Sequence, residues 1–262
     1  MSMLKLENIS LRFGGVNAVS NVTLEIEKGT IHALIGPNGA GKTSILNCIN
    51  KFYKPQQGRI HFLGEDITRL KPHQVATKGI ARTFQNIELF KGMTVLDNIK
   101  LGRHIFMKSG MFSASIYFGL AKREEIRHRR FIEEKIIELL QMEDIRKEIV
   151  GTLPYGFQKR IELARALALE PKLLLLDEPT AGMNVEETQY LVRYILDIKD
   201  VWNVTMLLVE HDMRVVMGIS DKISVLNFGQ MIAQGVVQDI QKDPLVVQAY
   251  LGEEKGADFV LD

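Results

Sequence analysis

Cysteine is almost absent from this sequence, which has only Cys48 among its 262 residues. One thiol forms neither an internal disulfide nor a multi-thiolate metal site, so disulfide scaffolds and zinc ribbons are excluded. The near absence of cysteine is also typical of proteins from a reducing compartment. We expect Cys48 to be a small apolar residue on a helix.

An excess of charge of either sign is missing as well. The chain carries 33 Lys and Arg against 32 Asp and Glu, a formal net charge of +1, with the signs mixed along most of its length. Such a chain lacks the field that attracts a nucleic acid or an anionic membrane without specific contacts. We therefore expect no nucleic-acid partner.

Long hydrophobic runs are also missing. The purest apolar run covers residues 173–176, whereas a membrane-spanning helix needs roughly 20 apolar residues. The first residues lack the basic segment and the apolar core of a signal peptide. We expect a soluble chain that buries about 70% of its unfolded surface and forms a sizeable core without staples.

The hydrophobic periodicity predicts an α/β fold. Alternating apolar and polar residues over 4–11 and 19–26 indicate an early antiparallel sheet. Further strands alternate with helices, which is typical of a mostly parallel sheet. The expected strands cover 30–36, 59–63, 80–85, 172–177, 204–210 and 222–228. The expected helices cover 42–52, a short stretch after Pro72, 94–107, 122–140, 156–169, 186–199 and 213–219.

Residues 36–43 read Gly-Pro-Asn-Gly-Ala-Gly-Lys-Thr and match the phosphate-binding pattern G-x-x-x-x-G-K-[ST] between a strand and a helix. Glycines let successive backbone N–H groups turn toward phosphate oxygens, and the following helix adds its positive end. We expect Lys42 to reach the β and γ phosphates and Thr43 to ligate Mg²⁺. The predicted ATP-binding residues of this loop are Gly36, Pro37, Asn38, Gly39, Ala40, Gly41, Lys42, Thr43 and Ser44.

Two carboxylates follow the apolar run at 173–176. Asp177 and Glu178 come at the carboxyl end of a predicted buried strand, which is where open α/β sheets bind ligands. Asp177 has the chemistry to complete a Mg²⁺ shell, and Glu178 to take a proton from an attacking water. Burying both carboxylates without a cation would be costly, so they predict a catalytic site.

These segments together resemble the ATP-binding subunit of an ABC transporter over nearly the whole chain. The matching features are the phosphate loop, Gln85, the segment Leu-Pro-Tyr-Gly-Phe-Gln-Lys-Arg at 153–160, the two carboxylates, Ala-Gly-Met-Asn at 181–184 and His211. The details are most similar to the ATP-binding subunits of branched-chain amino acid importers, at residues 12–15, 82–85, 89–90, 93–95 and 217–221.

The resemblance implies roles for single residues. It implies that Phe13 stacks on adenine, that Gln85 touches Mg²⁺ and the attacking water, and that His211 contacts the γ-phosphate. Without the resemblance, Phe13 and His211 are as readily explained as core or capping residues. The catalytic set is then Glu178, His211, Lys42 and Gln85, and the metal set is Thr43, Gln85 and Asp177.

The resemblance also implies a fold. We expect a P-loop ATPase of ABC type, with a mostly parallel core sheet, an antiparallel β subdomain and a helical subdomain inserted over about residues 86–152. One ATPase domain would cover 1–252, followed by a polar tail at 253–262. The aromatic stretch 105–120 would border the groove for a short helix of the membrane subunit, or form the core of the helical subdomain.

In this family two ATP molecules are sandwiched between two subunits, and the signature segment of one acts on the ATP of the other. The signature segment here consists of Leu153, Pro154, Tyr155, Gly156, Phe157 and Gln158. The usual sequence is Leu-Ser-Gly-Gly-Gln, and proline offers neither the hydroxyl nor the N–H of serine. We hypothesise that the site this segment completes on the partner is weakened; the alternative is that the departures are tolerated.

The function that the resemblance implies is ATP hydrolysis that drives amino-acid uptake, with ATP and Mg²⁺ as cofactors. The expected partners are a second ATP-binding subunit, transmembrane permease subunits and, indirectly, a solute-binding protein, at the cytoplasmic face of the cell membrane. Two alternatives are a soluble ABC-type ATPase and a nucleotide-dependent scaffold with weakened catalysis. The sequence leaves the solute, and the choice between homodimer and heterodimer, open.

Overall fold

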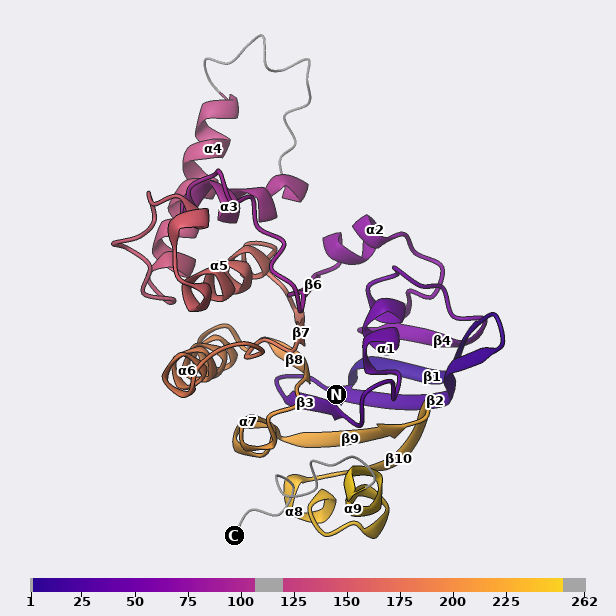
Figure 1. Ribbon diagram of the computed structural model, residues 1–262. Helices are drawn as coiled ribbons and strands as arrows, with labels where there is room; N and C mark the ends of the chain where they lie inside the picture. Colours follow the sequence, from indigo (N-terminus) through magenta and orange to yellow (C-terminus); the bar gives the residue numbers. More distant parts are fainter. Residues whose placement is uncertain (1, 107–119, 252–262) are drawn as a thin grey trace.

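A four-stranded antiparallel sheet forms one layer of the molecule. The computed structural model describes residues 2–106 and 120–251 (Figure 1). The strands of this sheet are β1 (Ser2–Phe13), β2 (Val16–Glu27), β4 (Gln57–Phe62) and β5 (Glu65–Asp66), in the order β2-β1-β4-β5. Apolar side chains alternate along β1 and β2 and are buried on one face, because successive side chains of a strand point to opposite faces. The expected antiparallel sheet is confirmed.

A six-stranded sheet lies beside it, in the order β10-β9-β3-β8-β7-β6. Its neighbouring strands are parallel except for β9 and β10, which form an antiparallel hairpin. The expected mostly parallel core sheet is thus confirmed. The strands are β3 (Ile31–Ile35), β6 (Ile80–Arg82), β7 (Leu173–Asp177), β8 (Thr205–Val209), β9 (Lys222–Asn227) and β10 (Gln230–Gly235).

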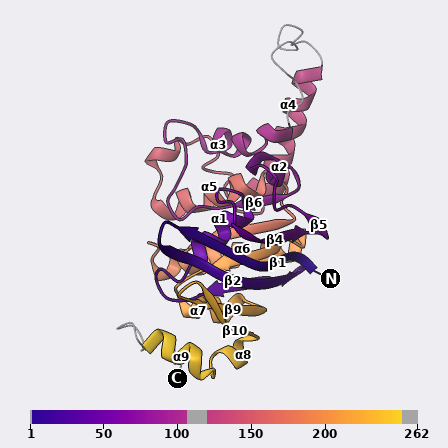
Figure 2. The same ribbon diagram turned by 90° about the vertical axis from the view of Figure 1, so that its right-hand side faces the viewer.

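Helices cover both faces of this sheet (Figures 1 and 2). Helices α3 and α4, a π-helix and α5 gather at one end of the molecule, and α8 and α9 lie at the other. The helices are α1 (Lys42–Ile49), α2 (Pro72–Thr77), α3 (Val95–Gly102), α4 (Leu120–Phe131), the π-helix Ile132–Ile137, α5 (Tyr155–Leu167), α6 (Val185–Trp202), α7 (Met213–Ile219), α8 (Val237–Ile240) and α9 (Pro244–Leu251). Short 3-10 turns cover His104–Phe106 and Val150–Thr152.

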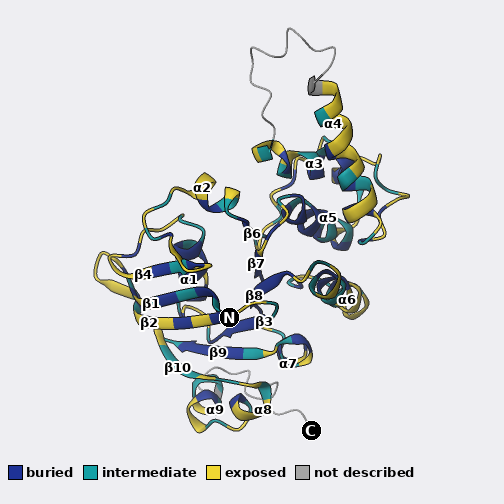
Figure 3. Ribbon diagram, turned by 180° about the vertical axis from the view of Figure 1, so that it is seen from behind, coloured by how far each residue is buried: buried dark blue, intermediate teal, exposed yellow. Residues whose placement is uncertain are grey.

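Strand β7 is buried on both faces, as its continuous apolar run predicts. Leu174 and Leu176 belong to the hydrophobic core shared with α3, α5 and α6. Leu173 and Leu175 belong to a second core shared with α1 and the antiparallel sheet. Figure 3 shows the buried strands between the more exposed outer helices. The strand that leads to the two carboxylates is therefore packed against a core on each face.

Several boundaries differ from the sequence expectations. Helix α1 ends at Ile49 and not at residue 52. Lys51 has a φ of 68°, a left-handed conformation that is incompatible with continuing a right-handed helix. Helix α3 begins after Thr94, whose hydroxyl accepts the N–H of Asp97, but it ends at Gly102 and not at residue 107. A Cβ atom on Gly102 would lie 2.4 Å from the carbonyl oxygen of Arg165, so close packing against α5 requires glycine there.

The C-terminal part was missed by the sequence analysis. Strand β10 and helices α8 and α9 follow β9. Buried side chains of α8 and α9 form a third core with those of α7, β3 and β9, and partly buried side chains of β10 pack against it. Cys48 is buried in α1 as expected. Most of the aromatic stretch 105–120, and the expected tail at 253–262, lie outside the described residues. Within the described ranges, no helix is long and apolar enough to cross a membrane.

Candidate active site

The phosphate loop connects β3 to α1 and needs glycine at two positions. Gly36 has a φ of 147°, and a Cβ atom there would lie 2.0 Å from the carbonyl oxygen of Leu226 in β9. Gly41 has a φ of 104°, and its Cβ would lie 2.5 Å from the carbonyl oxygen of Ala18. Both positions are therefore closed to any side chain by backbone conformation and by packing.

Lys42 closes the loop with its side chain. Its Nζ atom donates to the carbonyl oxygen of Gly36 at 2.6 Å and to that of Pro37 at 3.0 Å, and the residue is buried. Helix α1 begins at this lysine, and its N-cap, Gly41, offers no side-chain hydrogen bond. The first N–H groups of a helix have no partner inside it, so this end of α1 presents N–H donors and positive potential to an anion.

Asp177, at the end of β7, is paired with a cation that the sequence reasoning did not assign to the site. A guanidinium N–H of Arg82 donates to Asp177 Oδ2 at 2.6 Å, and both side chains are buried. The other terminal nitrogen of Arg82 donates to Asn47 Oδ1 of α1, also at 2.6 Å. Arg82 therefore supplies the compensating charge that a buried carboxylate requires.

Glu178 follows directly and is held by two side chains from other segments. The Gln85 amide donates to Glu178 Oε2 at 2.7 Å, and Nε2 of His211 lies 2.8 Å from Glu178 Oε1. The carboxylate only accepts, so His211 donates from Nε2. Glu178 has a φ of 48°, a left-handed conformation held by its N–H bond to the carbonyl oxygen of Val209. Such a conformation costs about 1 kcal/mol and is common at functional sites.

The buried carboxylate of Glu210 joins the loops that carry Glu178 and His211. From the sequence, Glu210 was expected only as the last residue of the strand 204–210. Glu210 accepts the backbone N–H and the hydroxyl of Thr180 on Oε1, and the backbone N–H of His211 on Oε2. The side chain is buried. The position of Glu210, a charged residue directly after the mostly apolar residues 204–209, was the one indication of this role in the sequence.

Phe13 lies at the end of β1 and is 46% exposed. The ring of Tyr53 packs edge-on against it, with the centroids 5.0 Å apart. The exposed face of Phe13 is available for stacking, and Tyr53 fixes its orientation. Sequence reasoning had no signal for Tyr53, because its role follows from its contact with β1.

The signature segment opens helix α5 and lies apart from the phosphate loop. Pro154 is the N-cap of α5, and its carbonyl oxygen accepts the N–H groups of Phe157 and Gln158. In Figure 1, α5 and α1 lie on opposite sides of β6 and β7. The structure therefore brings Gln85, Asp177, Glu178 and His211 together, but leaves the signature segment outside this group.

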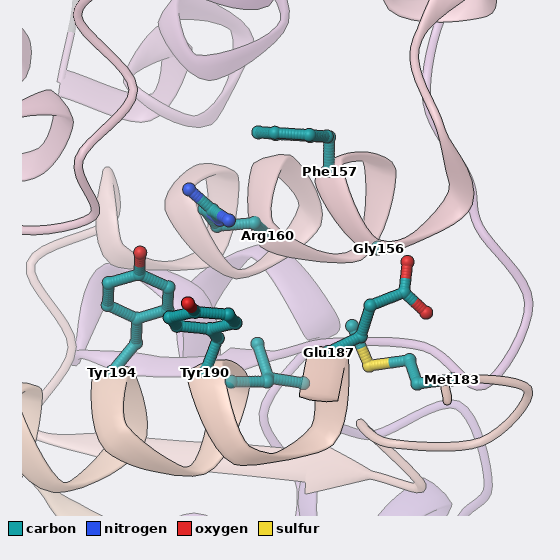
Figure 4. A pocket seen from close by; sticks show the side chains of 8 residues that line it. Gly156, Phe157, Arg160, Met183, Glu187, Tyr190 and Tyr194 are labelled. Carbon is teal, nitrogen blue, oxygen red and sulfur yellow. The ribbon is translucent and has the colours of Figure 1, made fainter. Parts of the chain in front are cut away.

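A small pocket lies between the start of α5 and helix α6, and Figure 4 shows its lining. The guanidinium of Arg160 stacks on the rings of Phe157 and Tyr194, at 4.7 and 4.8 Å from their centroids. Glu187 faces Gly156 from α6, so that a Cβ on this glycine would lie 2.6 Å from the Glu187 carboxylate. Phe157 therefore has a structural partner within its own chain.

The next turns of α5 carry two buried charged groups with shifted pKa values. Burial raises the pKa of the Glu162 carboxyl to about 7, an effect that the nearby Lys159 ammonium partly offsets. Burial also lowers the pKa of Lys159 from its ordinary value. Both side chains contact the backbone segment that contains Gln85, and the sequence reasoning gave neither a role.

The donor set fits a nucleotide with a magnesium ion. The cradle of backbone N–H groups around Gly39, where a Cβ would meet no atom within 4 Å, is open to an anion. Thr43 is exposed on the first turn of α1, and Asp177 keeps one carboxylate oxygen beyond the one that Arg82 binds. In residues 2–106 and 120–251, no three His, Cys, Asp or Glu side chains are grouped as a metal site. A hydroxyl and a carboxylate oxygen are ligands of the kind that Mg²⁺ takes, together with waters and phosphate oxygens.

Comparison with known proteins decides the family. The family model described as ABC transporter matches residues 19–181, a range that contains the phosphate loop, the signature segment and both carboxylates. The chain belongs to the ABC transporter family. A second family model, described as branched-chain amino acid ATP-binding cassette transporter, matches residues 230–256 of this ABC ATPase. That match covers β10, α8 and α9, the elements that periodicity had not predicted.

Relatives of this ABC ATPase match it over nearly their full length. It is 41% identical over 251 residues to the high-affinity branched-chain amino acid transport ATP-binding protein BraF of Pseudomonas aeruginosa, covering 96% of this chain and 98% of the relative. It is 41% identical over 257 residues to the corresponding protein LivG of Escherichia coli, with the same coverage. The crystal structure of the ADP conformation of an ATP-binding cassette of an ABC transporter superposes with a TM-score of 0.84 at 33% identity, covering 97% of this chain and all of that one.

Proposed function

We propose that this ABC ATPase powers the import of branched-chain or related amino acids through membrane subunits. The observation that carries the catalytic part is Glu178, held between Gln85 and His211 at the carboxyl end of β7. The proposed solute rests on the relatives, which are branched-chain amino acid transport proteins, and on the match at residues 230–256. ATP is the proposed nucleotide.

The proposed catalytic base is Glu178. Its two oxygens each accept one hydrogen bond, from Gln85 and from His211, and each keeps a lone pair for a further donor. A carboxylate oriented from both sides can use one of these lone pairs to take a proton from a water. His211 and Gln85 both contact the Glu178 carboxylate. His211 is therefore proposed to contact the γ-phosphate, and Gln85 the attacking water.

The proposed nucleotide site is the phosphate loop with Phe13. The loop donors and the N-terminus of α1 would hold the phosphates, Lys42 would leave its two carbonyl partners for the β and γ phosphates, and Phe13 would stack on adenine. The proposed Mg²⁺ ligands are Thr43, Gln85 and Asp177. When bound, Mg²⁺ neutralises charge on the phosphate oxygens, while Arg82 keeps Asp177 oriented.

A second ATP-binding subunit is part of the proposal. The signature segment lies away from the phosphate loop of its own chain, so it would act on the nucleotide of a partner cassette. Gly156 and the start of α5 would offer backbone N–H groups to the phosphates of that nucleotide. Because Pro154 offers no hydroxyl and Phe157 stacks on Arg160, we propose that this signature segment binds the partner's nucleotide weakly.

The proposed organisation is one ATPase domain over residues 1–252 with a helical subdomain inserted over about 86–152. The proposed location is the cytoplasmic face of the cell membrane, where permease subunits would hold the chain peripherally and a solute-binding protein would deliver the solute to them. Hydrolysis and separation of the two cassettes would then be transmitted to the permease subunits.

The variant Glu178→Gln tests the catalytic proposal. It keeps the shape of the side chain and removes its basicity, so Mg²⁺-dependent phosphate release should fall by at least about a hundredfold while ATP binding is retained. ATP, and not ADP, should then produce a dimer in size-exclusion chromatography with light scattering. Glu134→Gln, an exposed change on the π-helix, is the matched control and should behave as the wild type.

A variant that hydrolyses ATP at the wild-type rate would refute the role of Glu178. The solute is tested separately. Membrane vesicles that contain the copurified permease and solute-binding subunits should take up radiolabelled leucine, isoleucine or valine in the presence of ATP. Uptake of none of them, in vesicles that still hydrolyse ATP, would refute branched-chain amino acids as the solute.

A further inference from the structure

Helix α5 holds the backbone around Gln85 with three charged side chains on successive turns. The Nζ atom of Lys159 donates to the carbonyl oxygen of Gln85 at 2.7 Å and lies 3.5 Å from that of Phe84. The N–H of Phe84 donates to Glu162 Oε1 at 3.1 Å. One turn further, a guanidinium N–H of Arg165 donates to the carbonyl oxygen of Glu88. We call Lys159 and Glu162, which contact the residues nearest Gln85, the backbone clamp.

The segment that the backbone clamp holds has no regular structure of its own. It follows β6, which ends at Arg82, and precedes α3, which begins at Val95. Backbone N–H and C=O groups in such a segment need partners from elsewhere when they are removed from water. The backbone clamp supplies them for Phe84 and Gln85, and so fixes the direction in which the Gln85 side chain leaves the main chain.

Stability alone does not account for these charges. Lys159 and Glu162 are 2% exposed, and Nζ of the first lies 3.9 Å from Oε2 of the second. A buried ion pair is often no more stabilising than two apolar side chains of similar volume, because both charges lose their hydration. What an apolar pair would not supply is a donor for the Gln85 carbonyl and an acceptor for the Phe84 N–H.

The backbone clamp connects two sites that lie at a distance along the chain. Lys159 comes three residues after Gly156, on the helix that opens with the signature segment. Gln85, on the other side of the clamp, donates through its amide to Glu178. Because a helix moves as a rigid rod, a displacement of its start reaches Lys159 and Glu162, and through them the segment that carries Gln85.

We infer that Lys159 and Glu162 are positioning residues for hydrolysis: they hold the main chain of Phe84 and Gln85 so that the Gln85 amide meets Glu178, and they carry movements of the signature helix to that contact. This inference rests on the proposed role of Glu178. On this inference, the signature segment of a cassette contacts the nucleotide of the partner cassette. The backbone clamp then transmits that contact to Gln85 and Glu178 in the same chain as the signature segment.

A double-mutant cycle on ATP hydrolysis by the full chain tests the inference. Lys159→Met should lower kcat about ten- to a hundredfold, as expected for a misplaced catalytic contact, while the KM for ATP changes less than twofold. Gln85→Ala should lower kcat as well. If the clamp acts through Gln85, adding Lys159→Met to Gln85→Ala lowers kcat no further.

Two further variants separate positioning from folding. The double change Lys159→Met with Glu162→Leu replaces the pair by apolar side chains and leaves two backbone groups without their partners, so the protein should stay folded at the assay temperature, with a somewhat lower Tm, and lose kcat. Arg160→Met removes a cation one residue along the same helix that donates to the carbonyl oxygens of Leu140 and Gln141 instead. Any effect of Arg160→Met on kcat should multiply with that of Gln85→Ala.

The inference is overturned if the effects of Lys159→Met and Gln85→Ala on kcat multiply, or if the folded apolar pair retains the wild-type kcat. These outcomes leave the role of Glu178 intact. Conversely, an active Glu178→Gln variant would remove the basis of the proposed function, whatever the cycle gives.

Discussion

Glu162 should make the protein less stable as the pH rises from about 4.5 to about 7. Burial raises the pKa of this carboxyl from 4.5 to about 7, and Lys159 offsets only part of the rise. Below this window the carboxyl is protonated in both the folded and the unfolded chain, and above it ionised in both. Inside the window the unfolded chain has lost the proton that the folded chain still holds, so deprotonation favours unfolding. At about 1.4 kcal/mol per pKa unit, the free energy of unfolding falls by about 3 kcal/mol.

Urea denaturation of the wild type and of Glu162→Gln, at a series of pH values from about 4 to about 8, measures this contribution. Subtracting the two curves of unfolding free energy against pH cancels the contributions of the other titrating groups. As the pH rises through the window, the difference should change by about 3 kcal/mol in favour of the glutamine variant. Ile161→Val, the neighbouring position on α5, is the control and should show a difference that is independent of pH. A flat curve for Glu162→Gln, or one of opposite slope, would show that burial does not hold the proton on this carboxyl.

Four other variants test local features. Gly36→Ala should abolish ATP binding measured by calorimetry, because its Cβ would lie 2.0 Å from a carbonyl oxygen; Gly39→Ala meets no such atom and should lose only about 1–2 kcal/mol of stability through its positive φ. Asn184→Ala removes the capping box of α6 and should lower the free energy of unfolding by about 1 kcal/mol in urea. Pro154→Ser combined with Phe157→Gln should raise the steady-state ATPase rate of the assembled complex, and an unchanged or lower rate would contradict the weakened signature.

The parts of the site that were predictable from the sequence are those encoded within a few consecutive residues. The phosphate loop has its turn residues, its lysine and its helix start within residues 36–44, so the pattern is complete before the chain folds. The same holds for β7, whose unbroken apolar run predicts burial on both faces and places Asp177 at its end. The Thr94 cap of α3 is equally local.

Elements whose signal lies in their packing were not predictable in the same way. Helix α3 packs so closely on Arg165 of α5 that residue 102 has to be glycine, and the residues around position 102 do not reveal that contact. Strand β10, α8 and α9 pack their apolar side chains against α7 and β9. Their hydrophobic patterns are too short to predict a strand or a helix, and it is this packing that stabilises them.

The sequence by itself determined that this chain has a phosphate loop, a buried strand that ends in two carboxylates and an α/β architecture, because each depends on neighbouring residues and on a simple period. The tertiary structure decided which groups meet those carboxylates. Arg82 reaches Asp177 across 95 positions of the chain, and Gln85 reaches Glu178 across 93. Lys159 reaches the backbone of Gln85 across 74. Such pairs arise from the order of strands in the sheet and the packing of helices on it, and side-chain type alone does not reveal them.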